Sequence, residues 1–144
     1  MRYPLIATDI IIEYSDGRKG GVVLIKRKNP PHGLAIPGGI LEYGLTLKEN
    51  AIKEAKEETN LDVLIENNVL CINDNPDRDP RGHIISLAYI GKGAGRLEAG
   101  SDALSAELYN ITEIKDLIKK NLLVFDHPEI LMKYLTLKEQ DKND

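Results

Sequence analysis

The chain has 144 residues, of which 42% are hydrophobic and 29% charged, so it fits one soluble globular domain and excludes a disordered or collagen-like chain. Its net charge of -4 offers no basic surface, and we therefore expect neither nucleic acid nor an anionic membrane as a partner. The single cysteine, Cys71, excludes an internal disulfide framework and a zinc site built from several cysteines.

The apolar segments are too short for a membrane span, because none approaches the roughly 18 residues that such a helix needs. Asp9 interrupts the apolar stretch near the N-terminus, which argues against a secretory signal peptide. We expect a cytoplasmic protein whose single domain covers residues 1–137, followed by a polar, disordered tail over 138–144.

Two strands are predicted at the start of the chain. Residues 5–14 are rich in isoleucine, residues 21–28 run from apolar to basic, and a turn signal at 16–18 joins them as a hairpin. Two prolines in 29–33 end the second strand, because proline lacks the backbone donor that a strand ladder uses. A short apolar piece, 34–36, then leads to a pair of glycines.

A helix is predicted over 46–59. Thr46 is its expected N-cap, and Glu49 three residues later completes a capping box. One face is apolar with helical periodicity, through Leu47, Ala51, Ile52 and Ala55. Asn60 is the expected left-handed C-cap.

The rest of the chain alternates strand and helix signals. In chain order it predicts a strand within 61–73, a charged loop over 75–82, a strand over 83–91, a glycine-rich loop over 91–101, a short strand over 106–111, and helices over 114–120 and 128–137. Mixed strands with two or three helices in one small domain favour an α/β/α sandwich.

Three carboxylates lie within one turn of the predicted helix, at Glu54, Glu57 and Glu58. Like charges at this spacing repel by about a few tenths of a kcal/mol per pair. A divalent cation would reverse that sign, and Mg²⁺ takes oxygen ligands, few of them from the protein beside its waters and substrate phosphates. The cluster is typical of a site that hydrolyses phosphate esters or pyrophosphates.

A plainer interpretation exists, because acidic and basic residues alternate over 48–58 as they do on a solvated helix face with i, i+4 ion pairs. The glycines before the helix favour the functional interpretation. Gly38, Gly39 and Gly44 let the backbone bend sharply and approach a ligand next to the carboxylates.

These residues together resemble the Nudix hydrolase family, whose box reads G-x5-E-x7-R-E-U-x-E-E-x-G-U, with U a bulky aliphatic residue. Counted from Gly39, the chain matches the box at Glu54, Glu57, Glu58 and Leu61. The resemblance implies a mixed β-sheet with a loop–helix–loop catalytic motif. It also implies that the three glutamates and the Gly39 carbonyl hold Mg²⁺, with Mn²⁺ as the alternative, and that Gly38 and Gly39 contact substrate.

The chain departs from the box at four positions, one of which is Ala55 in place of a bulky aliphatic residue. Leu45 replaces its first glutamate, Lys53 its arginine and Asn60 its late glycine. Lys53 keeps the charge but loses the planar fork of arginine, and we expect it to orient the site by pairing with Glu57 at i, i+4. The three remaining glutamates favour an active enzyme, although the departures at Leu45 and Lys53 leave a slow enzyme or a weak binder as alternatives.

A second segment, 75–88 (NPDRDPRGHIISLA), resembles the P-x-R-D-P-R-G-H-x-x-S segment of an ADP-ribose pyrophosphatase branch of the family. This resemblance implies that Arg78 and Arg81 bind the substrate's diphosphate through bidentate contacts. The alternative is that both arginines pair with Asp77 and Asp79 and stiffen the loop.

Three further roles stay open. A catalytic base outside the box would come from Glu98, Asp102 or Glu107. An adenine ring would stack on Tyr14, Tyr43 or Phe125. A phosphate contact near the expected cleft would come from Lys26, Arg27 or Lys28, unless these are simply an exposed strand end.

The predicted function is Mg²⁺-dependent hydrolysis of a nucleoside diphosphate linked to another moiety, with ADP-ribose cleaved to AMP and ribose 5-phosphate. One alternative is hydrolysis of another nucleotide, such as a dinucleoside polyphosphate or an oxidised nucleoside triphosphate. The other is a catalytically weak sensor of ADP-ribose or another nucleotide. The expected partner is this small nucleotide, and the resemblance further implies a homodimer.

Overall fold

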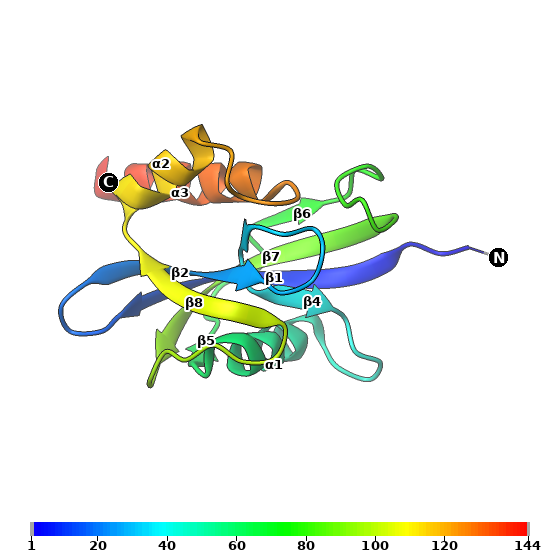
Figure 1. Cartoon of the computed structure of the whole chain (residues 1–144), viewed down its shortest axis with the longest axis horizontal. Helices are drawn as coiled ribbons and strands as arrows, with labels where there is room; N and C mark the ends of the chain where they lie inside the picture. Colours follow the sequence, from blue (N-terminus) through cyan, green and yellow to red (C-terminus); the bar gives the residue numbers. More distant parts are fainter. Residues whose placement is uncertain (1, 144) are drawn as a thin grey trace.

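A mixed β-sheet lies between two layers of helices in the computed structural model, which describes residues 2–143 (Figure 1). Helix α1 (Leu47–Thr59) covers one face of the sheet, and α2 (Ile111–Lys119) and α3 (His127–Asn143) cover the other. The predicted α/β/α sandwich is confirmed. Within the described range, none of the helices combines the length and apolarity needed to cross a membrane.

The sheet has eight strands with one parallel pair. In chain order they are β1 (Leu5–Ser15), β2 (Gly20–Arg27), β3 (Leu34–Ala35), β4 (Gly38–Ile40), β5 (Asp62–Leu64), β6 (Cys71–Asn73), β7 (Ile84–Ala94) and β8 (Ala103–Tyr109). The main order is β3-β2-β1-β7-β5, and β4, β6 and β8 pair with β1, β7 and β2 respectively. Strands β1 and β7 run parallel, whereas the other pairs are antiparallel.

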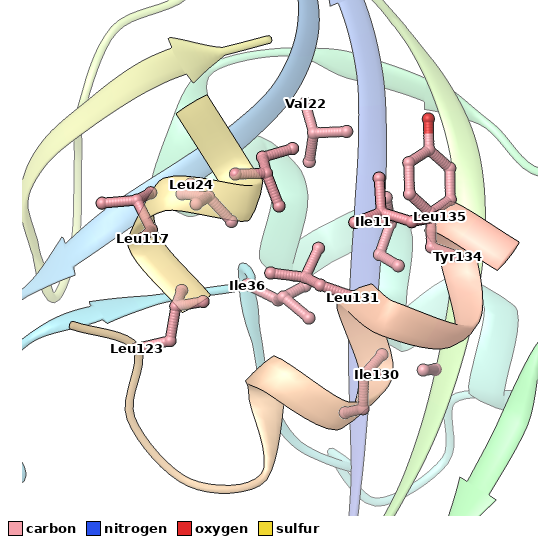
Figure 2. Close-up of a cluster of buried hydrophobic side chains, with 12 residues drawn as sticks. Ile11, Val22, Leu24, Ile36, Leu117, Leu123, Ile130, Leu131, Tyr134 and Leu135 are labelled. Atoms are coloured by element: carbon pink, nitrogen blue, oxygen red, sulfur yellow. The ribbon is translucent and has the colours of Figure 1, made fainter. Parts of the chain in front are cut away.

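The isoleucine run of β1 supplies the centre of both core layers. Because successive side chains of a strand point to opposite faces, Ile11 packs toward α2 and α3 while Ile10 and Ile12 pack toward α1. Figure 2 shows the first layer, in which Ile11 lies near Leu131 and Tyr134 of α3. A continuous apolar strand is stable here because both of its faces are covered.

Local rules predicted several elements correctly. The hairpin is confirmed, since β1 and β2 are antiparallel and the Asp16 carboxylate accepts backbone N–H bonds across their turn. The capping box is confirmed as well, because the Thr46 hydroxyl accepts from the Glu49 N–H and the Glu49 carboxylate accepts from the Thr46 N–H. Asn60 adopts the expected left-handed conformation, with φ of 66°.

Other predicted boundaries were wrong, because long-range contacts extend the elements. Strand β8 begins at Ala103 instead of 106, since its first residues pair with the end of β2. No strand was predicted at the glycine pair, but Gly38–Ile40 forms β4 against β1. Helix α3 continues past Leu137 to Asn143 instead of ending in a polar tail, because Lys138 pairs with Glu13 of β1.

Candidate active site

A cavity of about 430 Å³ opens where β4, α1 and the segment before α3 meet. Its walls bring together acidic and basic side chains that are far apart in the sequence. They include Asp9, Arg27, Gly38, Gly39, Glu54, Glu58, Arg78, Asp79, Arg81, Asp102, Phe125 and His127. The cavity therefore contains most of the predicted site, together with residues that sequence reasoning did not select.

Glu58 is a buried carboxylate of the cavity wall with a strongly raised pKa. It is 5% exposed, and the Gly38 N–H donates to its Oε1 over 2.9 Å. Its pKa is raised to about 8, chiefly by burial, with the charges of Glu54 and Asp9 adding to the rise and the Gly38 N–H opposing it. The site therefore holds a proton near neutral pH that an incoming cation would displace.

Glu54 lies directly against the glycine pair. A Cβ at Gly39 would stand 2.6 Å from the Glu54 carboxyl carbon, so a larger residue at this position would displace the Glu54 carboxylate. Burial and then the charge of Glu57 raise the pKa of Glu54. Gly39, Glu54 and Glu58 are thus brought together as predicted.

Glu57 lies outside the cavity walls. Its carboxylate forms an exposed ion pair with Lys53, and Lys53 also contacts Glu42 over 3.1 Å. The hydrogen bonds that Lys53 donates to Glu57 and Glu42 raise the pKa of Lys53. The predicted i, i+4 pair is confirmed, and it holds the third glutamate away from the other two.

The donor chemistry of the cavity suits a hard divalent cation. Among residues 2–143, no three His, Cys, Asp or Glu side chains are grouped closely enough to hold a metal ion. However, Mg²⁺ commonly takes one or two carboxylates and completes its shell with waters and substrate phosphates. Glu54 and Glu58 supply that number, and the charge of Glu54 raises the pKa of Glu58, a repulsion that a cation between them would relieve.

Asn50 orients the Gly39 carbonyl and was missed in the sequence. This fully buried residue of α1 donates through Nδ2 to the Gly39 oxygen over 3.3 Å and to the Thr8 hydroxyl over 2.9 Å. Its Oδ1 accepts from the Glu42 N–H. An amide among the apolar positions of the helix face was the available signal.

Arg78 has an unexpected partner. Its guanidinium donates from Nη2 and Nε to Asp126 over 2.6 and 2.9 Å, and its side chain is 4% exposed. Asp9 lies 4.0 Å from the same group. Arg78 therefore lines the cavity with its charge already neutralised by a residue 48 positions away, and not by Asp77 or Asp79.

Arg81 and Arg27 both lie over the Phe125 ring, 5.2 and 5.1 Å from its centroid. Arg81 also pairs with Asp79 over 2.8 Å, as one of the two sequence interpretations predicted. Arg27 donates to the carbonyls of Pro30 and Pro31, and within the described part of the chain no carboxylate lies within ion-pair distance of it. Burial and the charge of Arg81 lower its pKa, which marks a cation that an anion would stabilise.

The structure narrows the open roles. Of the three candidate bases, Asp102 lines the cavity, whereas Glu98 and Glu107, the latter in β8, are absent from its walls. Of the aromatic candidates, Phe125 lies in the cavity and adopts a left-handed φ of 56°, which is rare for a bulky residue. Tyr43 is fully exposed, and Tyr14 borders a separate cavity of about 670 Å³ that none of the α1 glutamates reaches.

The raised pKa of Glu58 gives a prediction for stability in the absence of metal. The pKa of Glu58 is about 8 in the folded protein, above the ordinary value of 4.5. Protonated Glu58 therefore contributes to the free energy of unfolding, fully below pH 4.5 and progressively less as the pH rises through 8. We expect the melting temperature of the metal-free protein to fall between pH 5 and 8, and Glu58→Gln to flatten this fall. Calorimetry in chelator-treated buffers would measure both slopes, and equal slopes would contradict the assignment.

Comparison with known proteins agrees with this geometry. The NUDIX domain family model matches residues 4–134. An ADP-ribose pyrophosphatase of Methanocaldococcus jannaschii is 39% identical over 139 residues, which cover 94% of this chain and 76% of that protein.

Solved structures show the same fold. A MutT/nudix family protein from Enterococcus faecalis is 26% identical with a TM-score of 0.74, and the match covers 92% of this chain and 61% of that longer chain. The NUDIX domain of Shewanella oneidensis NrtR, solved with ADP ribose, has a TM-score of 0.79 at 17% identity, with 94% of this chain and 89% of that one covered.

Proposed function

Because this chain belongs to the NUDIX family of pyrophosphohydrolases, we propose that it hydrolyses ADP-ribose to AMP and ribose 5-phosphate in a magnesium-dependent reaction. The observation that carries the proposal is one cavity in which two carboxylates of α1 and three arginines line the same space. The 39% identical relative named ADP-ribose pyrophosphatase supports the choice of substrate.

The carboxylates Glu54 and Glu58, with the Gly39 carbonyl, would hold Mg²⁺. Bound there, Mg²⁺ would neutralise phosphate charge and lower the pKa of an attacking water. Glu57 would join them by leaving Lys53, as the family resemblance implies. Mn²⁺ is the alternative ion, since it accepts similar oxygen ligands.

Arg27 and Arg81 would contact the diphosphate. Their guanidinium groups share the Phe125 ring, and planar guanidinium groups match phosphate oxygens in a bidentate manner. Arg78 would contribute less than the sequence implied, because Asp126 already engages it. Asp102 is the proposed catalytic base, because it borders the cavity whereas Glu98 and Glu107 do not.

The direct test is incubation of the purified protein with ADP-ribose and Mg²⁺, with chromatographic separation of products and parallel samples of Glu57→Gln and of wild type with excess chelator. We expect AMP and ribose 5-phosphate from the wild type with metal, and little product from either control. Binding of ADP-ribose without turnover would favour the sensor, and absence of both would direct attention to other nucleotides. The homodimer and the cytoplasmic location stay predictions.

Arg27→Ala is expected to raise KM for ADP-ribose about 10- to 100-fold, because charge-assisted hydrogen bonds contribute about 1.5–3 kcal/mol. The reason is that Arg27 is a half-buried cation without a carboxylate partner in the described chain. The matched control is Lys26→Ala, an exposed neighbour that does not line the cavity. Similar KM values for the two variants in steady-state kinetics would remove Arg27 from the binding site.

A further inference from the structure

We propose that His127 is a positioning residue, which fixes the segment 36–39 that leads from β3 into β4, so that the Gly38 amide and the Gly39 carbonyl keep their orientation toward the cavity. The kinetic consequence rests on the proposed function. The consequence for metal binding does not depend on the identity of the substrate.

His127 is held by two different contacts. It is the first residue of α3 and is 2% exposed, and its Nδ1 accepts the Ile36 N–H over 3.0 Å. Because a backbone N–H can only donate, Nδ1 carries no proton, and the neutral ring has its proton on Nε2. Nε2 lies 3.5 Å from Asp9 Oδ1. The imidazole ring therefore bridges the segment 36–39, through Ile36, and the buried carboxylate of Asp9.

Asp9 gives His127 a fixed support. The Ser86 hydroxyl donates to Asp9 Oδ2, and Arg78 lies 4.0 Å from that oxygen, which leaves Oδ1 facing His127. Burial alone would raise the pKa of Asp9, but His127, Ser86 and Arg78 together hold that pKa below its ordinary value. The carboxylate is thus anchored from β7 and its adjoining loop.

The segment 36–39 lies directly against the Asp9 carboxylate. Gly38 pairs with Asp9 in the β1–β4 register, and a Cβ at Gly38 would stand 2.5 Å from Asp9 Oδ1. The Gly38 N–H in turn donates to Glu58 over 2.9 Å. A displacement at Ile36 would therefore reach both the Glu58 carboxylate and the neighbouring Gly39 carbonyl.

Two variants separate the contacts of His127. His127→Asn places an amide oxygen near the position of Nδ1 and keeps an acceptor for the Ile36 N–H. His127→Gln places its amide near Nε2, so it keeps a group beside Asp9 and leaves the Ile36 N–H without its acceptor. The exposed His32→Gln serves as the control for a histidine-to-amide change.

We expect His127→Gln to lower kcat for ADP-ribose about 10- to 100-fold with KM changed less than about threefold, as for residues that orient metal ligands. We expect it to weaken binding of Mn²⁺ alone, measured by calorimetry without substrate, by about tenfold. His127→Asn should restore both quantities to within about threefold of wild type, and His32→Gln should match wild type.

Three results would overturn the inference. Equal losses of kcat in the Asn and Gln variants, at equal losses of melting temperature, would mean a merely structural role. A raised KM at unchanged kcat would mean that His127 contacts substrate. If the wild type does not hydrolyse ADP-ribose, the proposed function fails but the role of His127 can still be tested by metal binding. In that case, an affinity of His127→Gln for Mn²⁺ equal to that of the wild type would overturn this inference.

Discussion

Glu58→Gln is expected to lower kcat for ADP-ribose by about a hundredfold to a thousandfold, the range seen when a group that stabilises developing charge is removed. Glutamine keeps the volume of Glu58, and its amide oxygen can still accept the Gly38 N–H. It has no negative charge to offer a cation, however, so the loss reports on charge and not on packing. Steady-state kinetics over a range of Mg²⁺ concentrations would measure it.

The matched control is Glu66→Gln, which neutralises an exposed carboxylate whose partner, Lys92, lies 3.7 Å away at the surface. We expect its kcat to equal that of the wild type, because surface ion pairs contribute about 0–1 kcal/mol to stability and this pair is not part of the cavity. A Glu58→Gln enzyme within threefold of the control would exclude Glu58 from the proposed metal site.

Arg78→Met is expected to destabilise the folded protein by about 3–5 kcal/mol, because removal of one partner of a buried ion pair leaves the other charge uncompensated. Asp126 would lose two hydrogen bonds, and Asp9 would lose the nearby positive charge. For a domain of this size the loss corresponds to a fall of about 10–17 °C in melting temperature. Denaturant titration and calorimetry would measure both quantities.

Lys56→Met provides the comparison, since the Lys56–Asp62 pair is exposed on both sides and should contribute about 0–1 kcal/mol. The double variant Arg78→Met/Asp126→Leu should recover part of the loss, because it removes both charges of the pair. If Arg78→Met instead kept full stability and raised KM for ADP-ribose as much as Arg27→Ala, Arg78 would be a substrate contact, as the family resemblance implied.

The features predictable from the sequence are those that local rules govern. The capping box at Thr46, the left-handed Asn60 and the pair between Lys53 and Glu57 each depend on residues within four positions. The approach of Gly39 to Glu54 was expected from the family box. Short-range geometry and a known motif together therefore predicted the part of the cavity wall that is formed by Gly38, Gly39, Glu54 and Glu58.

The rest of the cavity wall depends on tertiary contacts that no local sequence pattern encodes. Asp126 reaches Arg78 across 48 positions, and His127 reaches Ile36 across 91. Both contacts require the parallel pairing of β1 with β7 and the placement of α3 over the sheet. The same holds for Arg27, whose importance follows from the absence of an acidic partner in the described chain, a property that the sequence alone does not reveal.

The start of α3 also bears on how the domain could be divided. At the start of α3, the helix on the opposite face of the sheet from α1, Phe125 and His127 line the cavity and Asp126 pairs with Arg78. A fragment that ends before residue 124 would retain every residue of the box but would lose Phe125, Asp126 and His127. The smallest catalytic fragment must therefore include the helix most distant in sequence from the box, and splitting the chain at 121–123 should yield two inactive halves that regain activity only on reassociation.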